Sequence, residues 1–405
     1  MRVNSFFKDA LGASRVTKAR RELIANASSE NLYHDHIRDL TQELHPAETR
    51  LRVTKVEHVS PTARRLTFVP CEGYVLPPFQ AGQYVSLDLK VGRTLTTRPY
   101  SISSAPYEAR RGNDSFVQIT VRDGKRGQGF AANWLYGLVR PGDEFMAHLP
   151  FGTFFYEPLR DAPHVVALAG GSGITPFLSM AREICHGTLD CDLTILYGSV
   201  TPDDIIARAE LDELAARCDR VKVIHVISGE ASGLPEGYER GFLSAELIER
   251  VSFGAPSDGQ TSYFVCGPLA MYRHVLDELA TLGVPERRIR TEVFGSQRDP
   301  RLNEDYPGAR GMETYKLTVH RGLERQVISA RSTEPLAVAL ERAAIRNHTR
   351  CRSGACGYCR CRLLSGEVYI PAVGDGRRWA DKTHGYVHAC STWPLSDCEI
   401  EVPII

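Results

Sequence analysis

Four cysteines with a distinctive spacing constrain this chain more than any other feature. Three of them read C-x4-C-x2-C within CRSGACGYC, and thirty residues separate Cys359 from Cys390 in HACSTWP. This spacing is typical of a plant-type [2Fe-2S] cluster, because a tight loop supplies three thiolates and a distant segment supplies the fourth. The sequence therefore predicts a protein that moves single electrons, with the metal ligands Cys351, Cys356, Cys359 and Cys390.

Other cysteines and histidines near this motif fit the ligand set less well. Cys361 follows a predicted ligand by two residues and would point away from it on a strand. Cys398 is the nearest rival to Cys390, but the HACSTWP context and the length of the gap favour Cys390. A zinc site would more typically show two short-spaced pairs. His384 and His388 are expected to be surface groups or groups that support the ligands.

Composition and charge exclude several classes of function. The 405 residues predict two to three domains, and 42% hydrophobic with 24% charged residues is typical of a globular protein. A formal net charge of zero argues against nucleic acid as an electrostatic partner. We find no apolar signal segment and no run of about eighteen apolar residues, so a cytoplasmic location without a membrane span is expected.

The order of predicted elements divides the chain into modules. Short alternating segments such as LRVTKVEHV and QYVSLDL predict a small antiparallel β-barrel, and the strand–helix alternation after it predicts a doubly wound parallel α/β sheet. A polar segment rich in Pro and Gly then separates a last α+β module that holds the cysteines. The predicted boundaries are 1–48 (helical extension), 49–157 (barrel), 158–298 (doubly wound domain), 299–313 (linker) and 314–405 (cysteine-containing module).

The N-terminal extension has two interpretations. Its apolar residues form a broken stripe, comprising Phe6, Phe7, Leu11, Leu23 and Ile24, among basic side chains. The first interpretation is a helical arm packed on the protein's own surface. The second is an amphipathic contact with a membrane surface or a membrane-bound partner.

The barrel carries a pattern suited to a flavin. In TTRPYSISS, Tyr100 can face the ring, Ser101 can donate near its reactive nitrogen, and Arg98 can pair with a phosphate. Downstream, the chain from Gly129 can open a helix over 132–135 whose free N–H groups would bind a phosphate. The alternative is that this strand carries Tyr and Ser only for packing. The position of the motif just ahead of a dinucleotide-type domain favours the flavin interpretation.

The doubly wound domain opens with ALAGGSGITPFLSM. Gly170, Gly171 and Gly173 lie between a predicted strand and a predicted helix, where the backbone can approach a pyrophosphate. Pro176 occupies the last position of the dinucleotide fingerprint, so a simple tight turn is the alternative. The later turns LYGS and VCGP fall at the carboxyl ends of parallel strands, where ligands bind.

Taken together, these motifs make the chain resemble the ferredoxin–NADP reductase superfamily. The resemblance is to its three-module members, in which a flavin barrel, a nicotinamide domain and a C-terminal β-grasp ferredoxin follow one another. Such members include reductase components of oxygenases, hydroxylases and desaturases. The resemblance covers about residues 49–405.

The resemblance also implies roles for individual residues. It implies catalytic roles near the flavin and nicotinamide for Ser101, Cys266 and Glu292. The implied flavin contacts are Arg98, Pro99, Tyr100, Ser101, Val121, Arg122, Gly129, Ala131, Ala132 and Phe294. Ala132 replaces a family serine, which removes one side-chain contact to the phosphate. The implied nicotinamide contacts are Gly170, Gly171, Gly173, Thr175, Pro176, Tyr197, Cys266, Gly267 and Pro268.

The cofactors expected from the resemblance are a [2Fe-2S] cluster, a flavin and a nicotinamide dinucleotide. FAD is expected, although one branch of the family uses FMN. After LYGS, relatives that prefer NADPH often have an arginine, whereas this chain has Val200 followed by Asp203 and Asp204. Acids near the ribose repel a 2′-phosphate, so NADH is expected, while Arg208 leaves NADPH open.

These parts predict a protein that converts two-electron transfer from NADH into one-electron transfer to a protein acceptor. A flavin can accept two electrons and release them singly, and the cluster can pass each one on. Arg350, Arg352, Arg360 and Arg362 are expected to form a basic rim for docking an acidic acceptor. Two alternatives are a reductase of a small quinone or nitro compound, and a binding module that responds to the redox state of its cluster.

Overall fold

The structure is a computed structural model, and it describes residues 6–27, 35–110, 112–124, 129–229, 233–295, 299–307, 312–372 and 374–404. The chain divides into two compact units, Met1–Leu44 and His45–Ile405. The first unit contains helices α1 (Phe6–Ala25) and α2 (His36–Leu44), which agrees with the predicted helical extension. The side chains of Phe6 and Phe7 lie outside the described residues. No described helix combines the length and the apolar character that crossing a bilayer requires.

The second unit begins with an antiparallel barrel. Leu51 and Val53 are buried in its core while Arg50 and Arg52, which alternate with them, are exposed, which is the period-two pattern of a half-buried strand. An isolated bridge between Ile102 and Ile119 links the end of β4 to β5 and closes the sheet. The strands follow the order β4-β3-β6-β1-β2-β5, and their bounds are β1 (Thr49–Ser60), β2 (Ala63–Pro70), β3 (Tyr84–Val91), β4 (Thr94–Ser101), β5 (Val117–Arg122) and β6 (Glu144–Phe151), with helix α3 (Phe130–Leu138).

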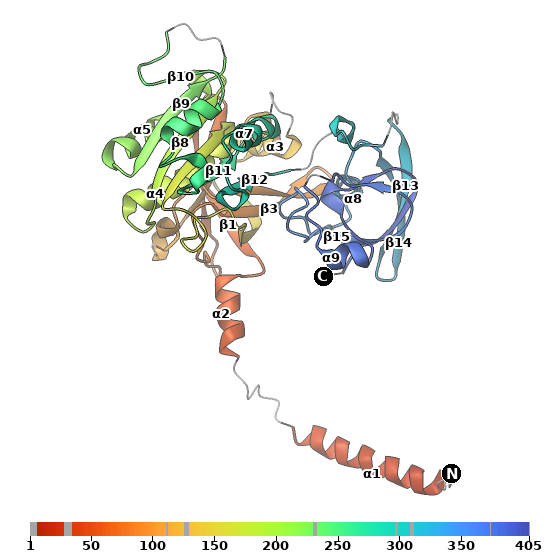
Figure 1. Cartoon of the computed structure of the whole chain (residues 1–405). Coiled ribbons are helices and arrows are strands. Elements are labelled where there is room, and N and C mark those ends of the chain that lie inside the picture. The colour runs from red at the N-terminus through yellow and green to blue at the C-terminus, as the bar shows by residue number, and fades with distance from the viewer. Residues whose placement is uncertain are drawn as a thin grey trace. The chain divides into compact units, whose positions relative to one another are not determined.

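A parallel sheet with helices on both faces follows the barrel (Figure 1). Alternate residues of β7 enter two different cores, Val165 and Ala167 with α4 and α5, and Val166 and Leu168 with α6 and α7. Burial on both faces explains the nearly continuous apolar run HVVALAG. The strand order is β10-β9-β8-β7-β11-β12, with β7 (His164–Gly170), β8 (Asp192–Ser199), β9 (Val221–Ile227), β10 (Glu239–Arg240), β11 (Thr261–Cys266) and β12 (Ile289–Glu292). The helices are α4 (Thr175–His186), α5 (Arg208–Arg217), α6 (Ala245–Val251) and α7 (Leu269–Thr281).

The C-terminal module is a mixed sheet of the β-grasp kind with one helix across it. A hairpin comprises β13 (Thr314–Arg321) and β14 (Glu324–Arg331), and β19 (Cys398–Glu401) joins β13 in parallel. The sheet order is β14-β13-β19-β15-β17, with β15 (Arg360–Ser365) and β17 (Tyr386–His388), and β16 (Val368–Tyr369) pairs separately with β18 (Trp393–Pro394). The helices are α8 (Leu336–Arg342) and α9 (Trp379–Thr383). The predicted fold class is thus confirmed in all its parts.

Two helices occupy only part of the segments whose sequences favour a helix, and the backbone gives the reason. The segment DIIARAELDELAARC yields a helix only from Arg208, because Ala207 adopts a left-handed φ of 55°. Similarly, α8 ends at Arg342 within PLAVALERAAIRN, and Ala344 has a φ of 57°. A residue with positive φ cannot continue a right-handed helix.

Candidate functional site

The carboxyl ends of the parallel strands bring the two predicted nicotinamide motifs together. In the sheet, β7 lies between β8 and β11, so the chain changes direction between β7 and β11. This is the topological switch point at which doubly wound folds bind their ligands. The glycine loop after β7 and the Cys266-Gly267-Pro268 turn after β11 therefore face each other.

Glycine at position 173 is required by this close approach. A Cβ atom built on Gly173 would lie 2.0 Å from the carbonyl oxygen of Cys266, and one built on Gly170 would lie 2.3 Å from Met271 Sδ. Any larger residue would push the two turns apart. The loop is further fixed by the buried Tyr197, whose hydroxyl donates to Gly171 O at 2.8 Å and accepts from Ile206 N at 3.1 Å. Tyr197 thus anchors the glycine loop to the chain segment that precedes α5.

A cavity of about 500 Å³ opens at this switch point. Gly170, Gly171, Val200, Asp204 and Pro268 are among the residues that line it. The size and place of the cavity fit a nicotinamide dinucleotide. Arg208, which left NADPH open, does not line it; its guanidinium lies 3.7 Å from Asp212 and over the ring of Tyr238.

Arg122 connects the barrel to the same cavity. Its Nη2 lies 3.2 Å from Asp204 Oδ1, and its guanidinium lies against Gly171. Asp204 also accepts a hydrogen bond from Thr201 Oγ1 at 3.2 Å. The predicted flavin residue Arg122 and the predicted nicotinamide loop are therefore in contact.

The three predicted catalytic residues meet where the barrel joins the parallel sheet. Ser101 Oγ donates to Glu292 Oε2 at 3.2 Å, and Cys266 stands opposite Glu292 in the parallel pair β11–β12. Burial raises the pKa of Glu292 well above its usual range, although the hydrogen bond from Ser101 acts to lower it. Burial likewise raises the pKa of the Cys266 thiol. Both groups are therefore held neutral next to each other in a water-poor pocket.

The sequence interpretation missed Tyr84, which stands opposite Ser101 in the pairing of β3 with β4. Its buried ring packs edge-on against Phe294 at 5.2 Å and contacts Phe151 at 6.0 Å between centroids. A Cβ atom on Gly152 would lie 2.9 Å from this ring, so glycine is required in the turn that ends the barrel. The signal that could have found Tyr84 is an aromatic residue at the start of a strand paired with the R-P-Y-S strand. The aromatic, hydroxyl and carboxyl groups gathered here fit a flavin ring.

The phosphate part of the predicted flavin site is only partly described. Helix α3 begins after Gly129, and among the described residues this N-cap position makes no side-chain cap hydrogen bond; Ala131 and Ala132 lie in its first turn. Residues 125–128 lie outside the described part of the chain. Tyr100 packs against the barrel core, as does Val121. The phosphate contact of Arg98 stays a prediction, because its described contacts are with Thr96, Thr97 and Glu341.

The four predicted cluster ligands are brought together by the C-terminal module. Cys351 contacts both Cys356 and Cys390, and Cys390 contacts Cys359. The amides of Ser353 and Cys356 both lie 3.4 Å from Cys351 Sγ, the kind of N–H···S bond that thiolate ligands accept. These contacts fit a [2Fe-2S] cluster, in which the four thiolates are shared between two irons. Within the described ranges, no group of three or more His, Cys, Asp and Glu side chains is arranged to hold a single metal ion.

The loop geometry explains the glycines between the ligands. Gly354 and Gly357 adopt φ of 84° and 76°, and a Cβ atom on Gly354 would lie 2.4 Å from Ser391 Oγ beside Cys390. His388 is buried, with Nδ1 bonded to Gly354 O and Nε2 3.5 Å from Asp381 Oδ2, while His384 is exposed. Cys361 and Cys398 both belong to the module's hydrophobic core. The same core also contains the predicted ligands Cys359 and Cys390, so the choice of ligands and the support role of His388 stay predictions.

The predicted basic rim is wrong for two of its four arginines. Arg350 and Arg352 are only 8% and 7% exposed, because the cluster loop packs against the flavin barrel. Ser86 Oγ of the barrel donates to Arg350 O at 3.2 Å, and Arg350 also lies over the rings of Phe151 and Tyr358. Arg360 and Arg362 are exposed as expected. Charge spacing in the sequence carried no information about this contact between modules.

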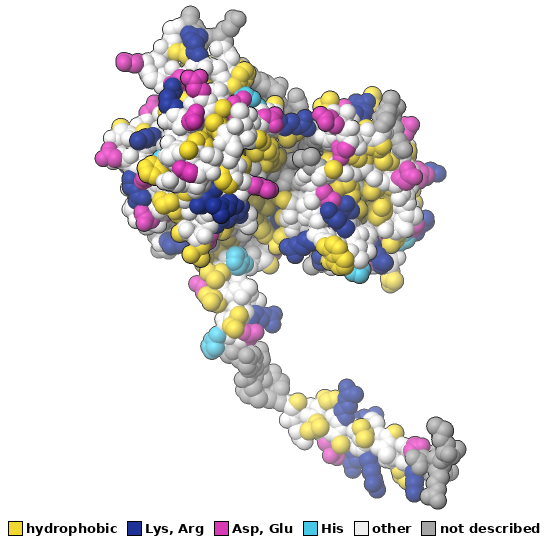
Figure 2. Space-filling view, in the orientation of Figure 1, with side chains coloured by type: hydrophobic (Ala, Val, Ile, Leu, Met, Phe, Trp, Pro, Cys, Tyr) yellow, Lys and Arg dark blue, Asp and Glu magenta, His cyan; other side chains and the backbone are white. Residues whose placement is uncertain are grey.

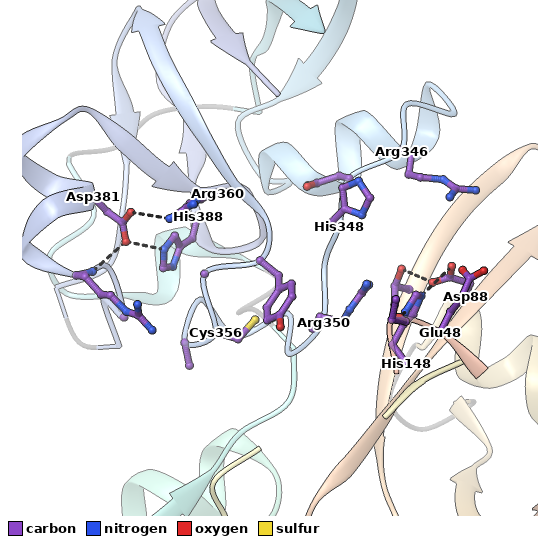
Figure 3. Close-up of a pocket in the computed structure, with 18 residues that line it drawn as sticks. Glu48, Asp88, His148, Arg346, His348, Arg350, Cys356, Arg360, Asp381 and His388 are labelled. Carbon is purple, nitrogen blue, oxygen red and sulfur yellow. Dashed lines mark hydrogen bonds and ion pairs between the residues drawn. The ribbon is translucent and has the colours of Figure 1, made fainter. Parts of the chain in front are cut away.

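Beside the cluster loop, a cavity of about 600 Å³ separates the ferredoxin-like module from the barrel (Figure 3). The cluster module contributes the arginines of this cavity, among them Arg346 and Arg350, together with Asp381, while Glu48 and Asp88 line it from the barrel side. The predicted ligand Cys356 lines the same cavity, and its neighbour Tyr358 is 50% exposed. The cluster position is therefore reachable from outside along this side.

Comparisons with known proteins agree with the motifs and the fold. An oxidoreductase NAD-binding domain matches residues 167–277, and a 2Fe-2S iron-sulfur cluster binding domain matches residues 320–395. The ferredoxin reductase component of 3-ketosteroid-9-alpha-monooxygenase from Mycobacterium tuberculosis is 30% identical over 360 residues, which cover 86% of this chain and 93% of the relative. This chain belongs to the ferredoxin–NADP reductase superfamily, in its branch with a C-terminal ferredoxin. The predicted family is confirmed.

Two further similarities support this assignment of the reductase. The glycine betaine monooxygenase reductase subunit of Chromohalobacter salexigens is 29% identical over 333 residues, covering 80% of this chain and 87% of the relative. The solved structure of phthalate dioxygenase reductase has the same fold, with a TM-score of 0.61, 23% identity, and coverage of 88% of this chain and 98% of that chain. The reductase is therefore an NAD(P)H-dependent oxidoreductase that uses a flavin and a [2Fe-2S] cluster.

Replacing Glu292 with Gln tests the buried carboxyl group through the pH dependence of stability. Because the pKa of Glu292 is raised, the folded state keeps a proton that the unfolded chain releases above about pH 4.3. Wild type therefore loses stability as the pH rises from there toward the folded-state pKa, whereas Glu292→Gln has no titrating group at this place. We expect the melting temperature of the variant, minus that of wild type, to increase with pH in calorimetry between about pH 5 and pH 8.

The matched control is Glu249→Gln, which changes an exposed carboxylate on α6. Its melting curve should follow wild type at every pH. Parallel curves for Glu292→Gln and wild type would contradict the raised pKa.

Proposed function

We propose that this reductase takes electrons from NADH, carries them through a flavin in the barrel to the cluster at Cys351, Cys356, Cys359 and Cys390, and delivers them singly to a partner oxygenase, hydroxylase or desaturase. One observation carries this proposal: the same barrel strand pair contacts both other modules. Ser101 of β4 bonds to Glu292 of the nicotinamide domain, and Ser86 of β3 bonds to the cluster loop. A flavin in the barrel would therefore lie between the electron source and the electron store.

The bound groups supply the redox chemistry, and the chain supplies position and exclusion of water. When bound, the flavin converts a two-electron donor into two one-electron steps, and the cluster stores one electron. We assign Gly170–Pro176 and Cys266–Pro268 to dinucleotide binding, and Arg98, Tyr100, Ser101 and Arg122 to flavin binding. The neutral Glu292 and Cys266 would keep charge away from the nicotinamide ring, while Ser101 keeps the Glu292 carboxyl oriented.

We infer FAD as the flavin and NADH as the preferred donor. Val200, which stands where relatives that prefer NADPH often have an arginine, lines the nicotinamide cavity together with Asp204. A carboxylate at this place disfavours the additional phosphate of NADPH. FMN and NADPH are the alternatives for the two sites.

Anaerobic mixing of the reductase with NADH tests the order of the cofactors. We expect the flavin and cluster absorbance to bleach together in wild type, because electrons reach the cluster through the flavin. The Cys390→Ser variant is the matched control, and there the flavin should still bleach without the cluster signal. If the cluster of wild type stays oxidised while its flavin is reduced, the proposed order is wrong. Rapid turnover of a quinone by Cys390→Ser would favour the small-molecule reductase instead.

We propose that the acceptor docks beside Cys356, on a surface defined by Arg360, Arg378, Tyr358 and Trp379. Arg360, Arg378 and Tyr358 line the cavity that reaches Cys356, and Trp379 next to Arg378 is 79% exposed. In Figure 2, hydrophobic side chains gather over α9 with Lys or Arg side chains beside them. Exposed aromatic and arginine side chains are the residues that most often anchor protein interfaces, and arginines favour an acidic partner.

Replacing Arg360 and Arg378 with Gln tests this docking surface. Using an acidic haem protein as the acceptor probe, we expect the double variant to lower the rate of probe reduction and to flatten its dependence on ionic strength. Reduction of a basic haem protein should not fall, and reduction of the reductase's own flavin and cluster by NADH should be unchanged. A wild-type rate that does not respond to salt would contradict the proposal.

We further propose that the reductase is cytoplasmic and that its N-terminal extension makes a peripheral contact with a membrane or a membrane-bound partner. Four of the eleven cysteines are assigned to the cluster and no disulfide joins any of the eleven, a pattern that we expect of a reducing compartment. Ile37, Leu40 and Leu44 recur on one face of α2, and Ile37 is 78% exposed. Figure 2 shows Lys and Arg side chains along α1 with hydrophobic ones between them, a composition that suits an anionic surface.

Co-sedimentation with anionic lipid vesicles tests this contact. We expect the full chain to sediment with the vesicles, and Ile37→Asp with Leu40→Asp to reduce the bound fraction without changing NADH-dependent flavin reduction. The control Gln42→Asp places a charge on the face of the same helix that lies away from Ile37 and Leu40. Equal binding by all three forms, or binding by none, would exclude a lipid contact.

A further inference from the structure

A single buried carboxylate lies between arginines from two different modules. Glu341, near the end of α8 in the ferredoxin module, accepts from both Nη atoms of Arg352, with the Nη2–Oε2 pair at 3.2 Å. Its Oε1 also lies 3.6 Å from Nη1 of Arg98 in barrel strand β4. Arg352 in turn approaches the barrel, with Nη1 3.5 Å from Thr97 O. One carboxylate thus joins the strand of the flavin motif to the cluster loop.

Burial makes this arrangement sensitive to the loss of its negative charge. The side chains of Glu341 and Arg352 are 4% and 8% exposed, and that of Arg98 is 23% exposed. Burial and the nearby charge of Arg352 lower the pKa of Arg98 to about 10, while Glu341 opposes that shift. Without the carboxylate, two positive charges on opposite modules would face each other with little water to screen them.

The location of Glu341 connects this charge balance to the electron path. Arg352 directly follows the ligand Cys351 in the cluster loop and has a left-handed φ of 59°, and its side chain is held by Glu341. Arg98 precedes Tyr100 by two residues in the flavin motif. On the other side of the junction the modules are separated by the cavity of Figure 3. Few other described polar contacts, such as that of Ser86 with Arg350 O, hold the cluster loop to the barrel.

We propose that Glu341 is a positioning residue that holds the cluster loop against the flavin strand and thereby sets the rate of electron transfer from the flavin to the cluster. This inference rests on the proposed order of cofactors. In each transfer one electron leaves the reduced flavin and one enters the oxidised cluster, and NADH supplies both electrons of a full cycle. Glu341 is not among the residues assigned to the flavin or the cluster, so the proposed effect acts through the separation of the two modules, and unchanged flavin reduction in its variants tests for a second effect through Arg98.

Single-turnover kinetics of Glu341→Gln test the proposal. We expect NADH to reduce the flavin at the wild-type rate and with the wild-type KM, while the later bleaching of the cluster slows by roughly ten-fold, which needs a change of only about 1.4 kcal/mol in the docking equilibrium. Glu341→Asp should recover part of the rate, because it keeps the charge. The rate is read from molecules that hold both groups, so incomplete cluster loading lowers the amplitude and leaves the rate interpretable.

Two further measurements separate positioning from a general loss of structure. The electron paramagnetic resonance spectrum of the chemically reduced cluster should match wild type, and amide hydrogen exchange in the oxidised protein should become faster in Thr94–Ser101 but not in the β13–β14 hairpin. The control Glu334→Gln removes a carboxylate that pairs with Arg342 inside the ferredoxin module. It should leave both the exchange pattern and the transfer rate unchanged.

The possible results are distinct. A wild-type rate of flavin-to-cluster transfer in Glu341→Gln would overturn the proposal, as would an equal slowing in Glu334→Gln. If instead the wild-type protein reduced its flavin but never its cluster, that result would contradict the proposed function. It would not by itself contradict the role of Glu341. Slowed transfer with unchanged exchange in Thr94–Ser101 would also overturn the positioning role.

Discussion

The contact between the cluster loop and the flavin barrel is the interaction on which the function of this reductase depends. A nicotinamide site and a cluster can each fold within its own module, but electrons pass between them only if the modules are held close together. The structure holds them with a small number of buried polar contacts, chiefly those of Glu341, Arg352 and Ser86. Buried ionic groups are costly to desolvate, so they contribute to the geometry of the junction more than to stability.

The junction between the barrel and the nicotinamide domain is built differently. There the Ser101–Glu292 hydrogen bond and the Arg122–Asp204 ion pair connect the barrel to the nicotinamide domain, and Arg290 reaches from β12 to Asp161 and to Thr153 O. Extensive apolar packing surrounds these contacts, with Phe154 of the barrel end lying against Phe177 and Phe264. This junction is continuous with a hydrophobic core, whereas the junction with the cluster module is bordered by an open cavity.

The difference between the two junctions suits their tasks. Transfer from a nicotinamide to a flavin requires two rings in direct contact, so that junction benefits from rigidity. An electron store that must serve an external acceptor benefits from an open side, and Cys356 and Tyr358 lie on such a side. Glu48 and Asp88 line this cavity from the barrel side, whereas the arginines that line it belong to the cluster module.

The sequence by itself determined the modules, their order and their cofactors. These features were recognised from the cysteine spacing, the glycine turns at strand ends and the R-P-Y-S strand. Each depends on local backbone geometry, which residues close together in the sequence determine. Only the tertiary structure decided what lies between the modules. Tyr84 and Glu341 belong to no recognisable motif. Arg350 and Arg352 were predicted to form a solvent-exposed rim, but the barrel buries them in the structure. The physical reason is that burial and charge pairing depend on surfaces from distant parts of the chain, and Arg98 and Glu341 meet only after two modules have folded and docked.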